Sequence, residues 1–387
     1  MHVKEFLHKL LSNTIHNGRL KTLSSTVEAA IHTKQLSLTK LGRSINLPIQ
    51  ERSGIQKVNR LLGNQRLRDD YLAITKAVST QIVGNKKHPI LIVDWTKYPN
   101  SNDAVIRAAI GIEGRAVTLY EERHNERSTG RRSIQTKFLI NLKKILPENC
   151  QPIIVTDAGF YNPWFKEVLR LGWDYIGRTR GNKMYRATEA DKFMRCSALY
   201  KQATKKVKSL GKMTLTEKNR FETNFYLIKL PSKRRKAFFA KGKWKSEKDS
   251  RDYARSHREP WLLVSSLCKR NSGKKVVSIY KKRMSIEEAF RDLKSPQYGF
   301  GLKQIKTVRK TRRDVILLIA MLASLAVTLA GIAGEKMKLH YQFQSNSIKH
   351  RRVLSIFYLG CQLIRKKIKI PLSFMWEVLT SLEVEYG

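Results

Sequence analysis

The chain has 387 residues, an apolar fraction of 41% and a formal net charge of +45, from 76 Lys and Arg against 31 Asp and Glu. This length allows two or three domains with a buried core, and the apolar fraction excludes disorder as the default. So large a positive charge destabilises a compact protein unless an anionic partner offsets it, which indicates nucleic acid or an anionic membrane. Because the positive charge is spread along the whole chain, its distribution favours nucleic acid.

The cysteines argue against a zinc knuckle and against a disulfide framework, because no two of them have a paired spacing. They are Cys150, Cys196, Cys268 and Cys361. Residues 1–5 do not begin the long apolar core of a signal peptide. We therefore expect a protein of the reducing cytoplasm.

Residues 1–80 are expected to form a helical, DNA-binding N-terminal domain. Apolar spacing predicts helices over residues 22–33, 38–45 and 56–62. Gly63 and Asn64 are a typical stop signal for the last of these helices. A short helix, a turn and a second helix that exposes Lys40 and Arg43 follow helix-turn-helix logic. A small helical bundle with a solvated basic face has the same pattern, so both interpretations are open.

Residues 81–182 change to an α/β pattern, which predicts the first part of a catalytic core. Apolar strands over residues 89–94 and 152–157 end at Asp94 and Asp157. The pattern also predicts strands over 105–112 and 116–120 with a hairpin turn at 113–115, helices over 133–146 and 163–171, and a strand over 175–178. This order indicates an α/β layer with a mixed sheet.

The second half of the chain begins with a Lys-rich, polar block over residues 183–255, which predicts a basic, β-rich insertion that faces DNA. The core resumes over residues 256–310. There the pattern predicts strands over 259–264 and 276–280 and a helix over 283–294. Residues 311–387 are expected to form a helical C-terminal region, with helices over 315–334, 353–364 and 374–382.

Residues 315–334 carry no charge and are long enough to span a bilayer. Basic residues flank the segment on both sides, it lacks an aromatic belt, and it is rich in Ala and Gly. A helix buried on all sides in a globular domain has the same composition. Because no other segment looks membranous, we expect a core helix and no membrane partner.

Three carboxylates are the candidate catalytic residues: Asp94 and Asp157 at strand ends, and Glu287 on a later helix. Ligands tend to bind at the strand ends of α/β sheets, and carboxylate oxygens suit Mg²⁺ or Mn²⁺. Two such ions about 4 Å apart promote phosphoryl transfer. Simpler interpretations are also open, because either Asp can cap the following turn and Glu287 can pair with Arg291 one helical turn on.

The helix over residues 283–294 is predicted to carry its functional side chains in one stripe. At about 100° per residue, Arg283, Glu287 and Lys294 lie within about 40° of one another, and Tyr280 joins them if the helix extends back that far. Such a stripe suits DNA. Arg and Lys would hold phosphates, Tyr the backbone, and Glu the metal.

These residues carry a resemblance to a known family. The spacing Tyr280-x2-Arg283-x3-Glu287-x6-Lys294 resembles the signature of the insertion-sequence-four family of bacterial DDE transposases. Residues 93–95 and 156–160 stand where that family carries its two aspartates. Other segments also look similar to it, at residues 41–43, 60–64, 117–121 and 291–296. The resemblance extends from about residue 38 to residue 365.

The resemblance implies a ribonuclease-H-like catalytic core, with an insertion between the second Asp and the Glu. It implies that Asp94, Asp157 and Glu287 hold two Mg²⁺ or Mn²⁺ ions. Contacts with DNA are expected from Tyr280, Trp261, Arg283, Met284, Arg291 and Lys294. Trp261 matches the position that receives a displaced base, although an aromatic core residue would fit the strand equally well. Met284 stands where some relatives carry a second stacking aromatic residue.

The resemblance also implies cut-and-paste transposition by nicking, hairpin formation, hairpin opening and strand transfer. The expected partners are double-stranded DNA, at the terminal inverted repeats and at the target, and a second copy of the chain in a synaptic dimer. The expected place of action is the bacterial nucleoid. Two alternatives stay open: a catalytically silent, regulatory DNA-binding protein, and a metal-dependent nuclease that cuts without joining.

Overall fold

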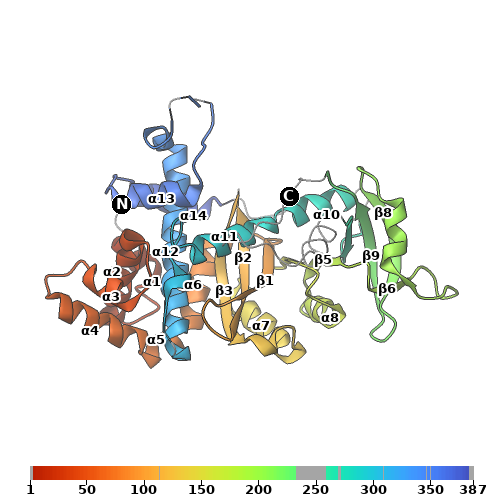
Figure 1. Ribbon diagram of the computed structural model, residues 1–387, viewed down its shortest axis with the longest axis horizontal. Helices are drawn as coiled ribbons and strands as arrows, with labels where there is room; N and C mark the ends of the chain where they lie inside the picture. Colours follow the sequence, from red (N-terminus) through yellow and green to blue (C-terminus); the bar gives the residue numbers. More distant parts are fainter. Residues whose placement is uncertain are drawn as a thin grey trace, which may run out of the picture. The chain divides into compact units, whose positions relative to one another are not determined.

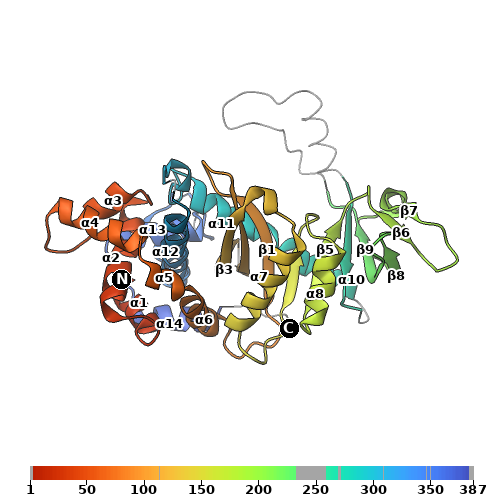
Figure 2. The same ribbon diagram turned by 90° about the horizontal axis from the view of Figure 1, so that it is seen from below.

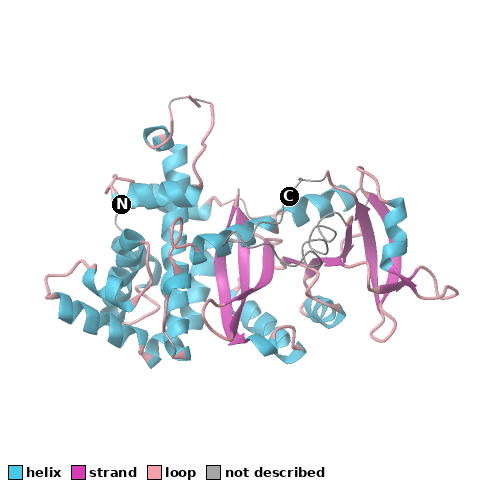
Figure 3. Cartoon of the chain, in the orientation of Figure 1, coloured by secondary structure: helices cyan, strands magenta, loops and turns pink. Residues whose placement is uncertain are grey.

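The structure is a computed structural model, and it describes residues 3–112, 114–231, 259–268, 272–307, 309–345, 347–348 and 350–382. The chain forms two compact units. Unit 1 consists of Met1–Pro152 and Met284–Gly387, and unit 2 consists of Ile153–Arg283. Unit 1 contains most of the helices, whereas unit 2 is rich in strands (Figure 3).

Six helices open unit 1, and the predicted N-terminal helices are confirmed within them. They are α1 (Val3–Leu11), α2 (Asn17–Thr33), α3 (Leu38–Arg43), α4 (Glu51–Leu62), α5 (Gln65–Asp69) and α6 (Tyr71–Val83). As predicted, α4 stops at Gly63, and the Asn64 side chain then accepts the N–H of Leu67 to begin α5. Helices α3 and α4 meet at Gly42 and Gly54, where an added Cβ on either residue would lie 2.4 Å from a backbone atom of the other helix.

A three-stranded antiparallel sheet forms the middle of unit 1. Its strands are β1 (Ile90–Lys97), β2 (Asp103–Ile112) and β3 (Arg115–Asn125), in the order β3-β2-β1. The predicted hairpin is confirmed, with Gly114 in the left-handed region at φ +69°, whereas residue 113 lies outside the described residues. The predicted helix over 133–146 corresponds to α7 (Arg132–Ile145), and Phe138 of α7 packs against the Tyr120 ring of β3.

The apolar helix is α12 (Lys310–Lys336), and it packs against α2, α13 (Ile356–Arg365), α14 (Leu372–Thr380) and β3. Figure 1 shows α13 crossing α12, and Figure 2 looks along α12. The crossing is close because Gly331 and Gly360 have no side chains, and a Cβ on Gly360 would lie 1.9 Å from the Val327 carbonyl oxygen. Among the described residues α12 is the one helix long and apolar enough to cross a membrane, yet 89% of its most apolar window is buried. The core-helix prediction is confirmed.

Unit 2 contains a mixed sheet in the order β4-β5-β10-β9-β8-β6-β7. Strands β4 and β5 are parallel and the other pairs are antiparallel. The strands are β4 (Ile153–Thr156), β5 (Asp174–Thr179), β6 (Met184–Arg186), β7 (Met194–Arg195), β8 (Lys208–Leu215), β9 (Phe221–Ile228) and β10 (Trp261–Ser265). Helix α8 (Asn162–Arg170) packs on β5, where Phe165 stacks on Tyr175 with ring centroids 4.6 Å apart. The fold is therefore mixed α/β.

Residues 183–231, where the sequence predicts part of a basic, β-rich insertion, contain β6 to β9, whereas residues 232–255 lie outside the described residues. The predicted strand over residues 276–280 is wrong, because these residues belong to α10 (Ser272–Lys281). Their buried side chains, Val276, Val277, Ile279 and Tyr280, have a spacing that fits a helix. A short apolar run does not distinguish a buried strand from a buried helix.

Tyr280 joins the predicted stripe of Arg283, Glu287 and Lys294 only if the helix extends back to it, and the structure does not meet this condition. Helix α10 ends at Lys281, and α11 (Met284–Lys294) begins three residues later. Tyr280 therefore lies on a different helix from Glu287 and Lys294, and Arg283 lies in the turn before α11. The backbone N–H of Arg283 donates to the Tyr280 carbonyl at 3.1 Å, which closes that turn.

Candidate active site

Asp94 lies in β1, at the point where the strand changes from buried to half-buried. Its Oδ1 accepts the backbone N–H of Trp95 at 2.8 Å. In the antiparallel register, Asp94 is opposite Arg107 of β2, and Arg107 is opposite Glu121 of β3. Directly opposed residues project from the same face of a sheet, so one face carries a row of acid, base and acid.

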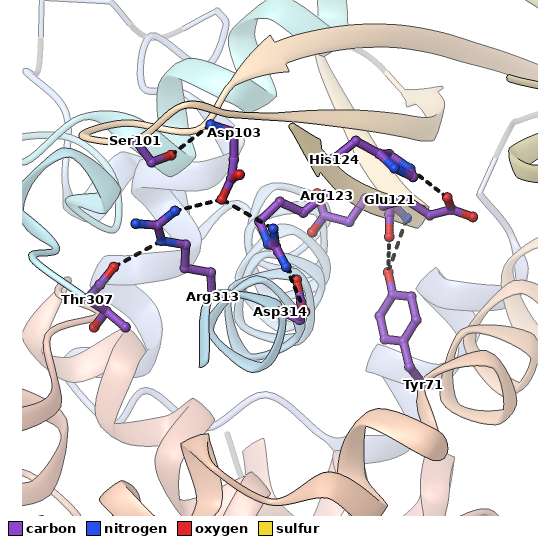
Figure 4. A network of polar contacts seen from close by, with 10 residues as sticks. Tyr71, Ser101, Asp103, Glu121, Arg123, His124, Thr307, Arg313 and Asp314 are labelled. Carbon is purple, nitrogen blue, oxygen red and sulfur yellow. Dashed lines mark hydrogen bonds and ion pairs between the residues drawn. The ribbon is translucent and has the colours of Figure 1, made fainter. Parts of the chain in front are cut away.

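Arg107 and Glu121 form a buried ion pair beside Asp94, each residue being 4% exposed. The guanidinium donates to Glu121 Oε2 at 2.6 and 2.9 Å. Burial raises the pKa of Glu121, and the Arg107 charge opposes that rise. The Glu121 backbone is held by the Tyr71 hydroxyl, which donates to its carbonyl at 2.9 Å (Figure 4).

Helix α11 packs across β1, β2 and β3 and carries Glu287 in its first turn, where the side chain is exposed. Phe290 fixes the helix over Arg107, whose guanidinium carbon lies 4.8 Å from the ring centroid. Asp292 fixes it to β3 by an ion pair with Arg115 at 2.5 Å. Within unit 1, the helix that carries Glu287 thus packs against the sheet that contains Asp94.

Lys294 lies at the other end of α11 and reaches the strand of Asp94. Its Nζ donates to Thr96 Oγ1 at 2.5 Å. Burial, together with the nearby charges of Arg107 and Lys303, lowers the pKa of Lys294 to about 8, and Asp94 opposes the shift. Thr96 is two residues after Asp94, so both side chains leave the same face of β1. Lys294 and Asp94 therefore belong to one neighbourhood of unit 1.

Asp157 directly follows β4 in unit 2 and is half-buried. Its Oδ1 accepts the N–H of Gly159 at 2.8 Å. The turn-capping role that we considered is thus present, and it occupies one of the two carboxylate oxygens. A carboxylate has about four acceptor sites, so this bond leaves capacity for a ligand.

The predicted metal site draws Asp94 and Glu287 from unit 1 and Asp157 from unit 2. Within either unit, the described residues contain no group of three or more His, Cys, Asp or Glu placed to hold a metal ion. The donor set itself consists of carboxylate oxygens, which suit Mg²⁺ or Mn²⁺. The two-ion site stays a prediction.

A family model described as Transposase DDE domain matches residues 85–324. The chain belongs to this family. The match covers more than half of the transposase, from the residues just before β1 into α12, and includes Asp94, Asp157 and Glu287. A search of curated proteins gives no match. Membership makes the protein a DNA-binding transposase, and it accounts for the partner that the charge of +45 requires.

The predicted DNA contacts of the transposase lie in varied settings. Trp261 is half-buried in β10, with its ring centroid 4.9 Å from that of Tyr280, which is 3% exposed. Trp261 thus has a packing partner, and base stacking on it stays a prediction. Met284, the first residue of α11, is half-buried, and the exposed Arg291 pairs with Glu288, the neighbour of Glu287.

Lys40 and Arg43 are exposed on α3, as the helix-turn-helix prediction requires. Arg43 also pairs with Glu51 of α4 at 3.4 Å, and both side chains are largely exposed. An exposed pair of this kind contributes little to stability, so it leaves Arg43 able to exchange Glu51 for a phosphate. Contact with DNA at α3 stays a prediction.

A second buried charge network joins the sheet of the transposase to α12 (Figure 4). Asp103, which is 2% exposed, accepts from Arg313 at 2.6 Å and from Arg123 at 3.2 Å. Arg123 also donates to Asp314 at 2.8 Å. Sequence reasoning missed this network and the Arg107 pair, although a lone Arg in the apolar run of β2 was a usable signal.

Proposed function

We propose that the chain is a cut-and-paste transposase of the insertion-sequence-four type, most like the transposase of the tetracycline-resistance composite transposon. The observation that carries this proposal is the family match over residues 85–324. That range contains the Tyr280, Arg283, Glu287 and Lys294 signature at the family's spacing. The substrate is double-stranded DNA at the terminal inverted repeats of the element and at the target.

The element order supports a ribonuclease-H-like core. Strands β1 to β3, helix α7, strand β4, helix α8 and strand β5 follow one another, and β6 to β9 stand between Asp157 and Glu287 as an insertion would. Residues 1–80 supply a helical DNA-binding domain, with Lys40 and Arg43 facing the partner. Helices α13 and α14 of the C-terminal region complete the helical packing around α12.

Asp94, Asp157 and Glu287 would hold two Mg²⁺ or Mn²⁺ ions through hard carboxylate oxygens. Such ions, when bound, activate the attacking oxygen and stabilise the leaving oxygen in phosphoryl transfer. The chain positions its own part of this site with buried contacts. Arg107, held by Glu121, supports α11 through Phe290, which fixes the helix that carries Glu287 over the strand that carries Asp94.

Lys294 and Arg283 bind phosphates of the DNA near the scissile bond, and Arg291 and Tyr280 assist them. Thr96 orients the Lys294 ammonium by accepting its hydrogen bond. Two element ends must be brought together before joining, so the active assembly is a dimer on DNA. The transposase acts at the nucleoid in the bacterial cytoplasm.

The test uses purified protein, Mg²⁺ and a linear DNA that carries the two sequences flanking this gene. We expect nicks at the element ends, hairpin intermediates and joined products when target DNA is added. Cutting without any joined product from pre-cut ends would replace the transposase by a nuclease. Specific binding without nicking would support the catalytically silent DNA-binding protein.

A further inference from the structure

Strand β3 lies at the edge of the sheet with β2 as its neighbour, so its outward N–H and C=O groups face no strand. At Glu121 one side chain binds both groups instead. The Tyr71 hydroxyl accepts the Glu121 N–H at 3.1 Å and donates to the Glu121 carbonyl at 2.9 Å (Figure 4). Burial raises the pKa of Tyr71, so the hydroxyl keeps the proton that it donates. Tyr71 thus gives this residue the bonds that a neighbouring strand would give.

Tyr71 is anchored in the N-terminal helices. It is the first residue of α6, and its ring lies against the Tyr120 ring of β3, with centroids 5.7 Å apart. The preceding residue, Asp70, accepts two hydrogen bonds from the Arg19 guanidinium of α2, at 2.8 and 3.1 Å. These bonds fix the corner between α5 and α6, and the Tyr71 hydroxyl connects this corner to β3.

A β-bulge just before Glu121 makes the direction of its side chain depend on the strand register. The pairing of β2 with β3 shifts by one residue at Leu119, which has no partner on β2. Bulges re-aim nearby side chains and are frequent next to active sites. A one-residue shift of β3 would turn Glu121 to the other face of the sheet, away from Arg107. The register of β3 at Glu121 therefore decides whether the Arg107 ion pair forms.

Packing does little to fix β3 at this point. A cavity of about 250 Å³ lies between α5, β3 and α12, and Tyr71 and Glu121 are among the residues that line it. Atoms that face a cavity lack the contacts that packed neighbours would supply. The two bonds of the Tyr71 hydroxyl therefore provide a restraint that side-chain packing does not provide here.

The ion pair of Glu121 leads to the predicted metal site. Arg107 donates to Glu121 at 2.6 and 2.9 Å and lies opposite Asp94 in the register. The Phe290 ring of α11 lies 4.8 Å from the Arg107 guanidinium, and Glu287 is about one turn earlier on the same helix. A displaced Glu121 would release Arg107 and, with it, this support of α11.

We propose that Tyr71 is a positioning residue for DNA cleavage: its hydroxyl fixes β3 at Glu121 and thereby holds α11, the helix of Glu287, over the sheet. The inference rests on the proposed function, because that function makes cleavage the reaction and Glu287 a metal ligand. It gives the N-terminal helices a role beyond binding DNA, since α6 supplies part of the support of the catalytic helix.

The first test measures single-turnover cleavage of the flanking DNA at saturating protein in Mg²⁺, with the affinity for DNA measured separately. Tyr71→Phe keeps the ring and loses both hydroxyl bonds, so cleavage should slow about tenfold while the affinity stays unchanged. Tyr120→Phe is the matched control, because the Tyr120 hydroxyl donates to Glu122 at 2.6 Å on the same strand but on the other face. Urea denaturation should show similar losses of stability for both variants, and the control should cleave normally. Equal cleavage rates in the two variants would overturn the proposal.

The second test asks whether Tyr71 acts through Glu121. Glu121→Gln removes the charge that holds Arg107 and should itself slow cleavage. In that background Tyr71→Phe should slow cleavage less than about threefold, because residues of one network have non-additive effects. A loss of about tenfold in both backgrounds, or normal cleavage by Glu121→Gln, would show that Tyr71 does not act through this ion pair and would overturn the proposal.

The third test does not depend on cleavage. Amide hydrogen exchange measures local opening, so Tyr71→Phe should speed exchange within α11 and Tyr120→Phe should not. If wild-type protein cuts DNA but Tyr71→Phe neither slows cleavage nor speeds exchange in α11, the positioning role is wrong and the transposase activity stands. If wild-type protein neither cuts nor joins DNA, the proposed activity is wrong. Faster exchange in α11 of Tyr71→Phe would then still show that the hydroxyl supports this helix, and unchanged exchange would overturn both proposals.

Discussion

Two groups of cations in this molecule have opposite surroundings. In unit 1, Arg107 and Arg313 are buried and each lies 2.6 Å from a carboxylate, Glu121 or Asp103. In unit 2, the buried Nε of Arg178 has no hydrogen-bond partner among the described residues, and the nearest acid of Arg180, Glu259, lies 3.8 Å away. The difference separates cations whose buried charge is matched by a carboxylate within the fold from a cation whose buried nitrogen is not.

The largest expected effect of this difference is on stability. Asp103→Ala leaves Arg123 and Arg313 without their shared buried carboxylate, so the free energy of unfolding should fall by about 3–5 kcal/mol. Arg178→Gln breaks no ion pair, and its effect should stay within about 1 kcal/mol. Urea denaturation of both variants measures this. Equal losses would remove the distinction between the two groups of cations.

The next effect concerns Lys294. This cation is intermediate between the two groups, because its hydrogen-bond partner, Thr96, is neutral. Thr96→Val removes the acceptor of a charged hydrogen bond worth about 1.5–3 kcal/mol, so the cleavage rate should fall at least about tenfold. Thr96→Ser retains the hydroxyl and should restore the rate. Single-turnover cleavage at saturating protein separates this effect from DNA binding. A normal rate in Thr96→Val would show that the bond does not position Lys294.

The smallest effect is a dependence on pH. Burial lowers the pKa of Lys294 to about 8, so the side chain is charged below that pH and neutral above it. The affinity for DNA should therefore decline between pH 7 and 9, by at most about fivefold for one phosphate contact. Lys294→Arg keeps its charge throughout, so this part of the decline should disappear. Titrations of both proteins at constant ionic strength test it, and identical profiles would count against a phosphate contact by Lys294.

The sequence predicted the parts of the site that depend on local pattern. Apolar runs that end in Asp predicted strand β1 and the end of strand β4. The spacing of the signature residues predicted helix α11. The same reasoning failed for residues 276–280, because five apolar-rich residues satisfy a helix and a strand alike. The spacing of apolar residues shows the period of a segment, but it does not show which other segments pack against it.

Contacts between segments far apart in the chain could not be predicted from the sequence. The bond between Thr96 and Lys294 joins residues 198 positions apart, and Asn162 of α8 donates to the turn between β8 and β9, more than 50 residues later. Neither has a signal in the spacing of residues. The isolated Arg107 in an apolar strand is different. A buried charge requires a partner, so its presence in an apolar run predicts a nearby opposite charge.

The central claim is that Asp94, Asp157 and Glu287 act as one metal-binding set. The most direct measurement compares Asp94→Asn, Asp157→Asn and Glu287→Gln with wild type on the flanking DNA in Mg²⁺, scoring binding and cleavage separately. Glu148→Gln, at an exposed site, is the matched control. Each of the three should bind DNA normally and lose cleavage by about a thousandfold or more, since the metal ions supply several kcal/mol, while the control cleaves normally. Cleavage near the wild-type rate in any one of the three would contradict the account.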